Sequence, residues 1–459
     1  MDKDPTTKKE EEILDIDRGF NFPKKLARLR YRLYWKAKKE GRFRFYTLFD
    51  RIYRKEVLDY ALTRLSRKRD SAAGIDGVRI YDIVSSEEGR KKFIDDLHEE
   101  LRSKRYKASP ILRRYIPKGA GKLRPLGIPT VKDRVVQAAT ALVISAIFEA
   151  DFKDLSYGYR PKKSANDAVN EIRKQINSGK TEVYDADLKG FFDNIPHDKL
   201  LKAVKFRISD KSVIKLIKQW LEAPIIEPDQ KGAAGKNRKG TPQGGVISPL
   251  LANIYMHWFD HQFLERFGNE HWRAKLIRYA DDFVIVAFKI TDKITDWVEK
   301  ELENRFGLPI NREKTSVVRL RAPNETLSFL GYTMRCVDDR YGRVRKFALV
   351  TPSKKSEMKL KENLRDLISH RRCYVPMTQL VQEVNRTLRG WANYFRLGYK
   401  RKSFRRIDKF VNRRLYRHSK KLSHKHYRTP KGVNFFEHLK QLGLVRLNAP
   451  VTRPSNALQ

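Results

Sequence analysis

The residues best suited to chemistry in this sequence are two adjacent aspartates, Asp281 and Asp282. They stand between two short apolar runs, residues 276–277 and 283–286. Two β-prone runs joined by a short polar break predict a hairpin with the carboxylates at its turn. Adjacent ionised aspartates repel each other unless a cation lies between them, so the turn is a candidate metal site. An Asp pair in a turn is also common as plain solvated turn chemistry, which is the alternative interpretation.

A third aspartate lies at the end of another predicted strand, residues 183–188. Side chains alternate between the two faces of a strand, so Asp185 and Asp187 share one face. A carboxylate in mid-strand is costly unless it is paired or binds a metal. If Asp187 faces Asp281 and Asp282, three carboxylates converge. Such a set suits two Mg²⁺ ions, which clamp the attacking and leaving oxygens in phosphoryl transfer.

Basic side chains gather on a second predicted hairpin, residues 111–129. Its turn is rich in Pro, Gly and Lys, and its two arms would place Lys118, Lys122 and Arg124 near one another. Lys supplies a point charge and Arg a bidentate fork, so this hairpin suits a bound triphosphate. A solvated basic hairpin is the alternative interpretation.

Two further segments carry polar side chains that could meet a nucleotide. Gln243 stands beside a glycine pair that precedes a predicted helix, and backbone N–H groups freed at such a pair can approach a base or sugar closely. Residues 310–315 form a polar turn that carries Lys314.

Helical periodicity predicts the elements that must position these segments. Residues 26–37 and 57–65 are predicted to be surface helices that cover a core, in preference to a purely nucleic-acid-binding arm. Residues 131–148 form a long apolar helix, most simply core, and residues 166–176 form another helix. A turn with exposed aromatics and Arg160 lies between those two helices.

The charge of the chain points to a polyanionic partner. Lys and Arg number 99 against 55 Asp and Glu, a formal net charge of +44 over 459 residues. Such a charge favours nucleic acid as the partner. Only Cys336 and Cys373 are present, which argues against a disulfide framework and against structural zinc. We expect neither a signal peptide nor a membrane span, because no run approaches 18 apolar residues.

The charge is densest in residues 386–431, where 17 Lys or Arg stand against one acid, Asp408, a net charge of +16 over 46 residues. Basic residues neutralise phosphates and aromatic residues stack on unpaired bases, so this segment is predicted to contact nucleic acid. The candidate RNA- or DNA-binding residues are Arg389, Trp391, Tyr394, Arg396, Lys400, Arg401, Arg405 and Arg413.

Taken in chain order, these segments resemble the group II intron-encoded reverse transcriptases, the maturase family. The matching segments are residues 74–77, 124–129 and 158–161, Asp187 with Phe191-Phe192-Asp193, residues 242–245 and 279–282, Lys314, residues 330–332 and residues 390–395. Each segment alone is weak, but their order over residues 45–430 is specific.

The resemblance implies an α+β fold: a right-hand polymerase with fingers, a palm with an antiparallel sheet, and an α-helical thumb. The implied boundaries are residues 23–345 for fingers and palm and residues 355–432 for a basic thumb or maturase domain. We expect a disordered lead over residues 1–22 and a short extension over residues 433–459. The Cys-rich endonuclease of many members has no counterpart here.

The resemblance also implies the roles of individual residues. Asp187, Asp281 and Asp282 would bind two Mg²⁺ ions, with Mn²⁺ as a substitute. Lys314 would act as general acid toward pyrophosphate. The implied nucleotide-binding residues are Lys118, Arg124, Arg160, Gln243, Gly244 and Phe192, the last as the steric gate against a ribose 2′-OH, with Phe191 as the competing choice.

The implied function is RNA-directed DNA polymerase activity, together with binding of intron RNA to assist splicing. The implied partners are an RNA template, group II intron RNA, a DNA primer or target and dNTPs, with no membrane and an open oligomeric state. The implied location is the bacterial cytoplasm, in association with the nucleoid or a ribonucleoprotein, or an organelle. Two alternatives stay open: a free-standing reverse transcriptase in antiviral defence or repair, and an RNA-splicing protein with vestigial polymerase activity.

Overall fold

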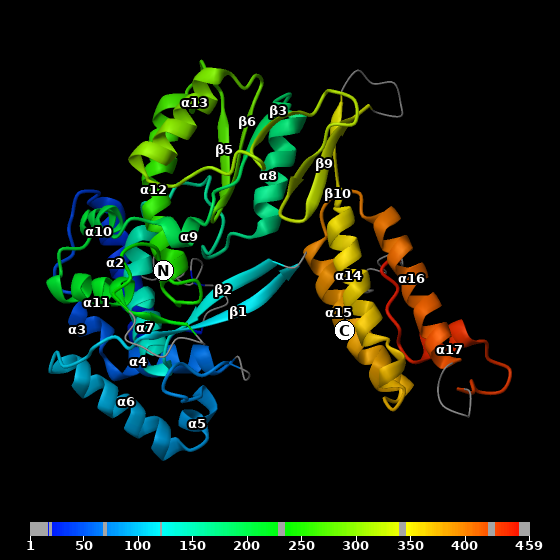
Figure 1. Cartoon of the computed structure of the whole chain (residues 1–459), viewed down its shortest axis with the longest axis horizontal. Helices are drawn as coiled ribbons and strands as arrows, with labels where there is room; N and C mark the ends of the chain where they lie inside the picture. Colours follow the sequence, from blue (N-terminus) through cyan, green and yellow to red (C-terminus); the bar gives the residue numbers. More distant parts are fainter. Residues whose placement is uncertain are drawn as a thin grey trace, which may run out of the picture. The chain divides into compact units, whose positions relative to one another are not determined.

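The computed structural model describes residue 17 and residues 21–67, 71–119, 122–227, 235–338, 346–420 and 427–448. The chain divides into two compact units (Figure 1). The first comprises residues 1–164 and 184–317, and the second residues 165–183 and 318–459. Most of the expected lead, the tip of the basic hairpin and the end of the chain after residue 448 lie outside the described residues.

The first unit is built from helices around two sheets. Its helices are α2 (Lys24–Lys39), α3 (Phe49–Ile52), α4 (Lys55–Ser66), α5 (Ile80–Val84), α6 (Glu87–Arg102), α7 (Val131–Glu149), α9 (Phe191–Asn194), α10 (His197–Lys205), α11 (Lys211–Glu222), α12 (Ser248–Phe267) and α13 (Asp292–Lys300), which runs into a π-helical turn, Glu301–Arg305. Its strands are β1 (Ile111–Gly119), β2 (Lys122–Ile128), β4 (Ile225–Ile226), β5 (Lys275–Tyr279) and β6 (Asp282–Ala287). Strands β3 (Glu182–Ala186) and β7 (Ser316–Arg319) run across the boundary along the chain.

Helix α7 is the centre of the core of the first unit. The side chain of Thr130 caps it by accepting a hydrogen bond from the backbone N–H of Asp133. Nearly every residue of α7 is buried, as expected of a helix that is apolar on all sides. Helices α2 and α4 pack against it. These observations confirm the core helix and the two covering helices that the sequence predicts.

Both predicted hairpins are present in the first unit. Strands β5 and β6 pair antiparallel with Tyr279 opposite Asp282, and they lie in a four-stranded sheet of order β5-β6-β3-β7. Strands β1 and β2 pair antiparallel with Ile116 opposite Arg124. Each hairpin forms where two β-prone arms flank a short turn.

The second unit combines a small sheet with a helical bundle. Its elements are α8 (Ala165–Asn177), β8 (Leu327–Phe329), β9 (Tyr332–Val337), β10 (Phe347–Pro352), α14 (Lys354–Leu367), a 3₁₀ turn (His370–Arg372), α15 (Met377–Tyr394), α16 (Arg401–Ser419) and α17 (Phe435–Gln441). The strands pair antiparallel in the order β10-β9-β8. Helix α14 packs against α15 and α16, and the three lie side by side in Figure 1. Their buried faces, which include Leu364, Leu380 and Ile407, form the bundle core.

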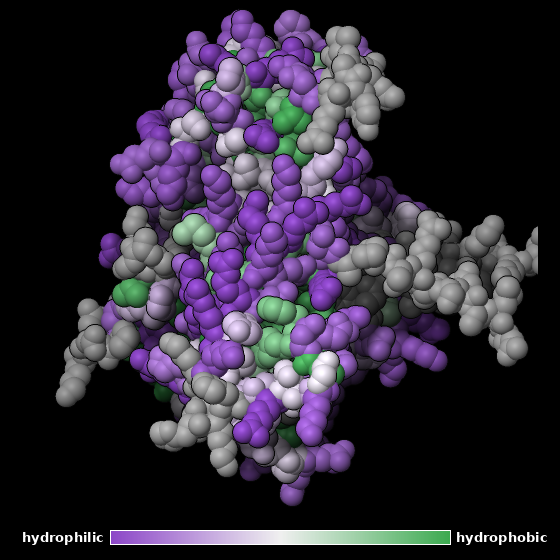
Figure 2. Space-filling view, turned by 90° about the vertical axis from the view of Figure 1, so that its right-hand side faces the viewer, coloured by the Kyte–Doolittle hydropathy of each residue, from purple (hydrophilic) through white to green (hydrophobic). Residues whose placement is uncertain are grey.

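Mixed helix and antiparallel sheet, followed by a helical C-terminal region, is the architecture that the sequence predicts. Hydrophilic side chains cover most of the face drawn in Figure 2. In the part of the chain that the structure describes, no helix has both the length and the apolar character needed to cross a bilayer.

Candidate active site

The turn between β5 and β6 presents the two adjacent aspartates. Because Tyr279 pairs with Asp282, only Ala280 and Asp281 lie between the strands. Ala280 has φ +60°, in the left-handed region that residues with a Cβ seldom adopt. Asp282 is exposed and Asp281 is half-buried, so both carboxylates belong to the surface of the turn.

Asp187 directly follows β3, the strand next to β6 in the sheet. Its Oδ2 accepts a hydrogen bond of 3.0 Å from Nδ2 of Asn311 and lies 3.2 Å from Nζ of Lys314. The backbone reinforces this contact: Asn311 N donates to Asp187 O at 2.8 Å, and Asp187 N donates to Oγ1 of Thr315 at 3.2 Å. The polar turn singled out for Lys314 therefore holds Asp187 through three residues. Sequence reasoning missed Asn311 and Thr315, although they lie in that same turn.

The pKa of Asp185, on β3, reflects the negative charge near the ends of β3 and β6. Burial, together with the negative charges of Asp282 and Asp187, raises the pKa of Asp185 to about 6. Two carboxylates from different strands thus act on a third. The strands β3 and β6 gather negative charge at one place in the first unit.

These carboxylates fit a divalent cation in donor type. Carboxylate oxygens are the ligands that Mg²⁺ prefers, and a cation would relieve the repulsion that Asp185 reports. In the described ranges, no group of three or more His, Cys, Asp or Glu side chains is arranged closely enough to hold a metal ion. Asp187 is instead engaged by Asn311 and Lys314.

Two nucleotide-binding candidates from distant motifs meet in the structure. Nε of Arg124, on β2, donates a hydrogen bond of 2.8 Å to Oε1 of Gln243. Gly244 has φ +119°, and a Cβ there would lie 2.2 Å from the carbonyl oxygen of Gly127, so this approach requires glycine. Lys118 lies in β1, but its side chain is outside the part of the structure that is described.

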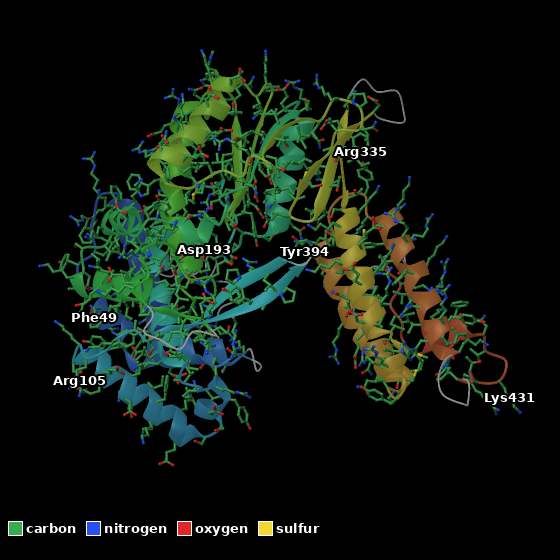
Figure 3. The ribbon with its side chains drawn as sticks, viewed as in Figure 1. Phe49, Arg105, Asp193, Arg335, Tyr394 and Lys431 are labelled. Carbon is green, nitrogen blue, oxygen red and sulfur yellow. The ribbon has the colours of Figure 1, made fainter. Side chains whose placement is uncertain are left out.

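The two steric-gate candidates are adjacent and both buried. The rings of Phe191 and Phe192 pack edge to face at 5.1 Å. The carbonyl of Phe192 accepts a hydrogen bond of 2.7 Å from the N–H of Thr241, which brings Phe192 beside the loop that carries Gln243. The next residue, Asp193, is labelled in Figure 3. Burial raises the pKa of Asp193, and nearby arginines, Arg124 among them, oppose that shift.

Arg160 is not brought to the nucleotide-binding candidates. It is buried, and its Nη2 lies 2.7 Å from Oε1 of Glu149. Its Nη1 donates to the carbonyl of Ser156 at 2.8 Å, so the guanidinium holds its own loop together. The neighbouring Tyr159 is exposed, and partial desolvation together with the charge of Asp281 raises its pKa. Tyr159 is thus a neighbour of the aspartate turn that sequence reasoning did not single out.

The basic C-terminal candidates divide into packing and surface residues. Trp391 packs on Phe395 and Phe404, with ring centroids 4.8 and 5.6 Å away. The hydroxyl of Tyr394, a residue labelled in Figure 3, donates to Leu330 O at 3.0 Å. Lys400 is half-buried, and its Nζ donates to the carbonyl of Arg396 at 3.2 Å. The exposed candidates are Arg389, Tyr394, Arg396, Arg401, Arg405 and Arg413.

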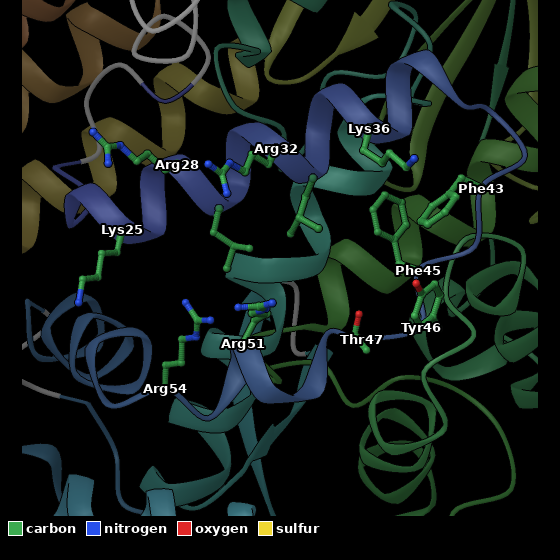
Figure 4. Close-up of a pocket in the computed structure, with 12 residues that line it drawn as sticks. Lys25, Arg28, Arg32, Lys36, Phe43, Phe45, Tyr46, Thr47, Arg51 and Arg54 are labelled. Atoms are coloured by element: carbon green, nitrogen blue, oxygen red, sulfur yellow. The ribbon is translucent and has the colours of Figure 1, made fainter.

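A second basic surface lies in the first unit, between α2 and the segment that contains α3. It is a hollow of about 470 Å³, and Figure 4 shows Arg51 and Arg54 facing the basic side chains of α2 across it. The cations that line it are Lys25, Arg28, Arg32, Lys36, Arg51 and Arg54. Phe43, Phe45 and Tyr46 line one end, and none of the described lining residues is Asp or Glu. We call this surface the basic hollow.

Comparison with known proteins agrees with these features. The family described as reverse transcriptase (RNA-dependent DNA polymerase) matches residues 116–334, and the group II intron, maturase-specific domain matches residues 358–434. The chain is 34% identical to protein YkfC of Escherichia coli over 333 residues, 65% of this chain and 85% of the relative. It is 28% identical to the group II intron-encoded protein LtrA of Lactococcus lactis over 437 residues, 77% of this chain and 70% of the relative. It is also 35% identical to the putative COX1/OXI3 intron 1 protein of Saccharomyces cerevisiae over 293 residues, 53% of this chain and 34% of that protein.

Fold, site and relatives together define the class as a reverse transcriptase with a maturase-specific region. The chain belongs to the group II intron reverse transcriptase and maturase family. It is an RNA-directed DNA polymerase, a class of enzyme that generally uses divalent metal ions.

Proposed function

We propose that this chain extends a DNA primer on an RNA template with two Mg²⁺ ions held by Asp187, Asp281 and Asp282. The supporting observation is that β3 and β6 are neighbours in one sheet, with Asp187 directly after β3 and Asp282 at the start of β6. The ions would supply charge neutralisation at the reacting phosphate. Phosphoryl transfer asks little covalent work of the protein, so the remaining residues bind and orient.

Five further candidates have roles in this proposal. Arg124 and Gln243 bind the incoming dNTP as one hydrogen-bonded pair. Lys314 holds Asp187 and donates a proton to the pyrophosphate as it leaves. Phe192 excludes the ribose 2′-OH, with Phe191 as the competing residue, and residues 23–345 form the fingers and palm.

We propose RNA contacts on both units separately. On α16, Arg401, Arg405 and Arg413 are exposed at spacings of four and eight residues, which places them along one side of the helix. The thumb or maturase region, residues 355–432, would hold intron RNA through these cations and assist its splicing. The basic hollow has the charge and the aromatic rim that suit a single-stranded segment.

Primer extension on an RNA template with Mg²⁺ and dNTPs tests the polymerase proposal. Asp281→Ala should abolish extension, while Asp296→Ala, which removes an exposed carboxylate from α13, should leave it unchanged. Extension that survives Asp281→Ala would refute the metal-ligand assignment. A splicing assay with the cognate intron RNA tests the maturase role separately, because Asp281→Ala should still support splicing.

A further inference from the structure

A buried ion pair lies directly behind the aspartate turn. Arg278, on β5, and Asp260, on α12, are each 1% exposed. Nε of Arg278 donates to Oδ1 of Asp260 at 2.8 Å, and Nη2 donates to Oδ2 at 2.5 Å. Removing two charges from water is costly, and such a pair adds little stability over well-packed apolar side chains. We therefore consider a role for this ion pair in positioning the turn as well as in stability.

The remaining nitrogen of Arg278 reaches the turn itself. Nη1 donates 3.0 Å hydrogen bonds to the carbonyl oxygen of Ala280 and to Oδ1 of Asn253. The peptide unit is planar, so holding the Ala280 carbonyl fixes the orientation at which the chain enters Asp281. The left-handed φ of Ala280 is unfavourable for a residue with a Cβ and persists where surrounding contacts impose it.

A second segment supports the turn from the same side. Nδ2 of Asn253 donates to the carbonyl of Gly158 at 2.8 Å. The N–H of Tyr157 donates to the carbonyl of Arg278 at 2.8 Å, so residues 155–158 lie against β5. A Cβ on Gly158 would lie 2.5 Å from the backbone nitrogen of Ala280. The backbones of Gly158 and Ala280 are therefore packed together too closely for a side chain at position 158.

We infer that Arg278 is a positioning residue that sets the direction of the Asp281 carboxylate. Asp260 and Asn253 orient its guanidinium, and we call these three residues the buried clamp. The inference rests on the proposed role of Asp281 as a metal ligand. The plainer interpretation is that the buried clamp only attaches α12 to β5. The two interpretations differ in what an apolar replacement of the ion pair would do.

The decisive variant is Arg278→Met combined with Asp260→Leu, which removes both charges and fills the space. If the buried clamp only adds stability, this folded variant should retain the parental rate. If it positions Asp281, the single-turnover extension rate should fall about 100-fold, because small misplacements of reacting groups have effects of that size. Mn²⁺ binding, followed by electron paramagnetic resonance without nucleic acid, should weaken roughly 10-fold.

Two single variants keep the test decisive if the double variant does not fold. Asn253→Ala retains the ion pair but removes an acceptor from Arg278, and Gly158→Ala pushes on Ala280. Both should slow extension while the affinity for the RNA template stays parental. The matched control is Tyr106→Phe, which breaks a buried network with Asp133 and Trp220 that involves neither β5 nor β6.

The Tyr106→Phe control should lower thermal stability and leave the single-turnover extension rate of the folded enzyme unchanged. A parental rate and parental Mn²⁺ binding in the folded double variant, or parental rates in both single variants, would overturn the inference. A parental enzyme that fails to extend primers would instead refute the proposed polymerase function. In that case the Mn²⁺ measurement still tests the buried clamp.

Discussion

The guanidinium of Arg124 is hydrogen-bonded to the side-chain carbonyl of Gln243 at 2.8 Å, across 119 positions of sequence. The backbone repeats this link, since the N–H of Gly127 donates to the carbonyl of Gln243 at 2.6 Å. The basic hairpin and the loop before α12 are therefore joined at two points. This joint makes the two nucleotide-binding candidates energetically dependent on each other.

Replacing Arg124 or Gln243 by Ala should lower kcat/KM for dNTPs about 10- to 100-fold, because hydrogen bonds to charged groups contribute roughly 1.5–3 kcal/mol. The double variant should lose less than the product of the single losses, since each removes the same pair. Steady-state kinetics with varied dNTP measures both effects. Arg114→Ala, on the exposed part of β1, is the control and should leave kcat/KM unchanged. Fully multiplicative losses would contradict the pairing.

Lys314→Ala should lower kcat about 100-fold with a smaller change in KM, because general acid–base groups contribute roughly 10²–10⁴-fold. Nζ of Lys314 lies 3.2 Å from Asp187, where it would donate a proton to the leaving pyrophosphate. Arg312→Ala, in the same turn, removes a cation that is paired with Glu303 and should have little effect on kcat. Equal losses in the two variants would indicate a general electrostatic effect in place of proton donation.

Phe192→Ala should raise the incorporation of ribonucleotides relative to deoxyribonucleotides by about 10-fold or more, because a smaller side chain admits the 2′-OH. Phe191→Ala is the matched variant, since both rings are buried and in contact. Competition between rNTP and dNTP in primer extension gives the selectivity directly. Unchanged selectivity in Phe192→Ala with a change in Phe191→Ala would transfer the role to Phe191.

Protonation of His257 should favour the unfolded chain below about pH 6.5, whereas the raised pKa values of Asp185 and Asp151 favour the folded chain over the same range. Burial lowers the pKa of His257 to about 3, and Lys153, His261 and Arg278 add to the shift. The unfolded chain binds the proton near pH 6.5 and the folded chain resists it, so unfolding free energy decreases with acidity by up to about 1.4 kcal/mol per pH unit. Denaturant titrations between pH 7 and pH 5 measure this slope. Relative to the parent, His257→Leu should lose less stability between pH 7 and pH 5, and His261→Leu, at a more exposed position, should behave like the parent.

Arg405→Gln combined with Arg413→Gln should weaken RNA binding and reduce the slope of log K against log salt by about 1.4 for single-stranded RNA. Both guanidinium groups are exposed on α16. Arg406→Gln is the control, because the guanidinium of Arg406 lies 2.5 Å from Glu357 and is already paired. A slope that does not change in the double variant would contradict phosphate contact at this helix.

The hairpins, the core helix α7 and its covering helices α2 and α4 were predictable because each follows from local periodicity and turn chemistry. The grouping of Asp187 with the aspartate turn could be hypothesised, because a carboxylate in a strand is costly without a partner, and it stays a prediction. The residues that hold these aspartates in position were not predictable from the sequence. Asn311 and Arg278 are ordinary polar residues in sequence, and their contacts with Asp187 and Ala280 depend on tertiary packing. The ion pair between Arg160 and Glu149 could not be predicted for the same reason, since the two residues lie on different elements.

The contact between Gly158 and Ala280 limits how this enzyme can be redesigned. Here a Cβ at position 158 would lie 2.5 Å from the Ala280 nitrogen, and the left-handed φ at position 280 disfavours branched side chains. Libraries that keep positions 158 and 280 small should therefore retain more active clones.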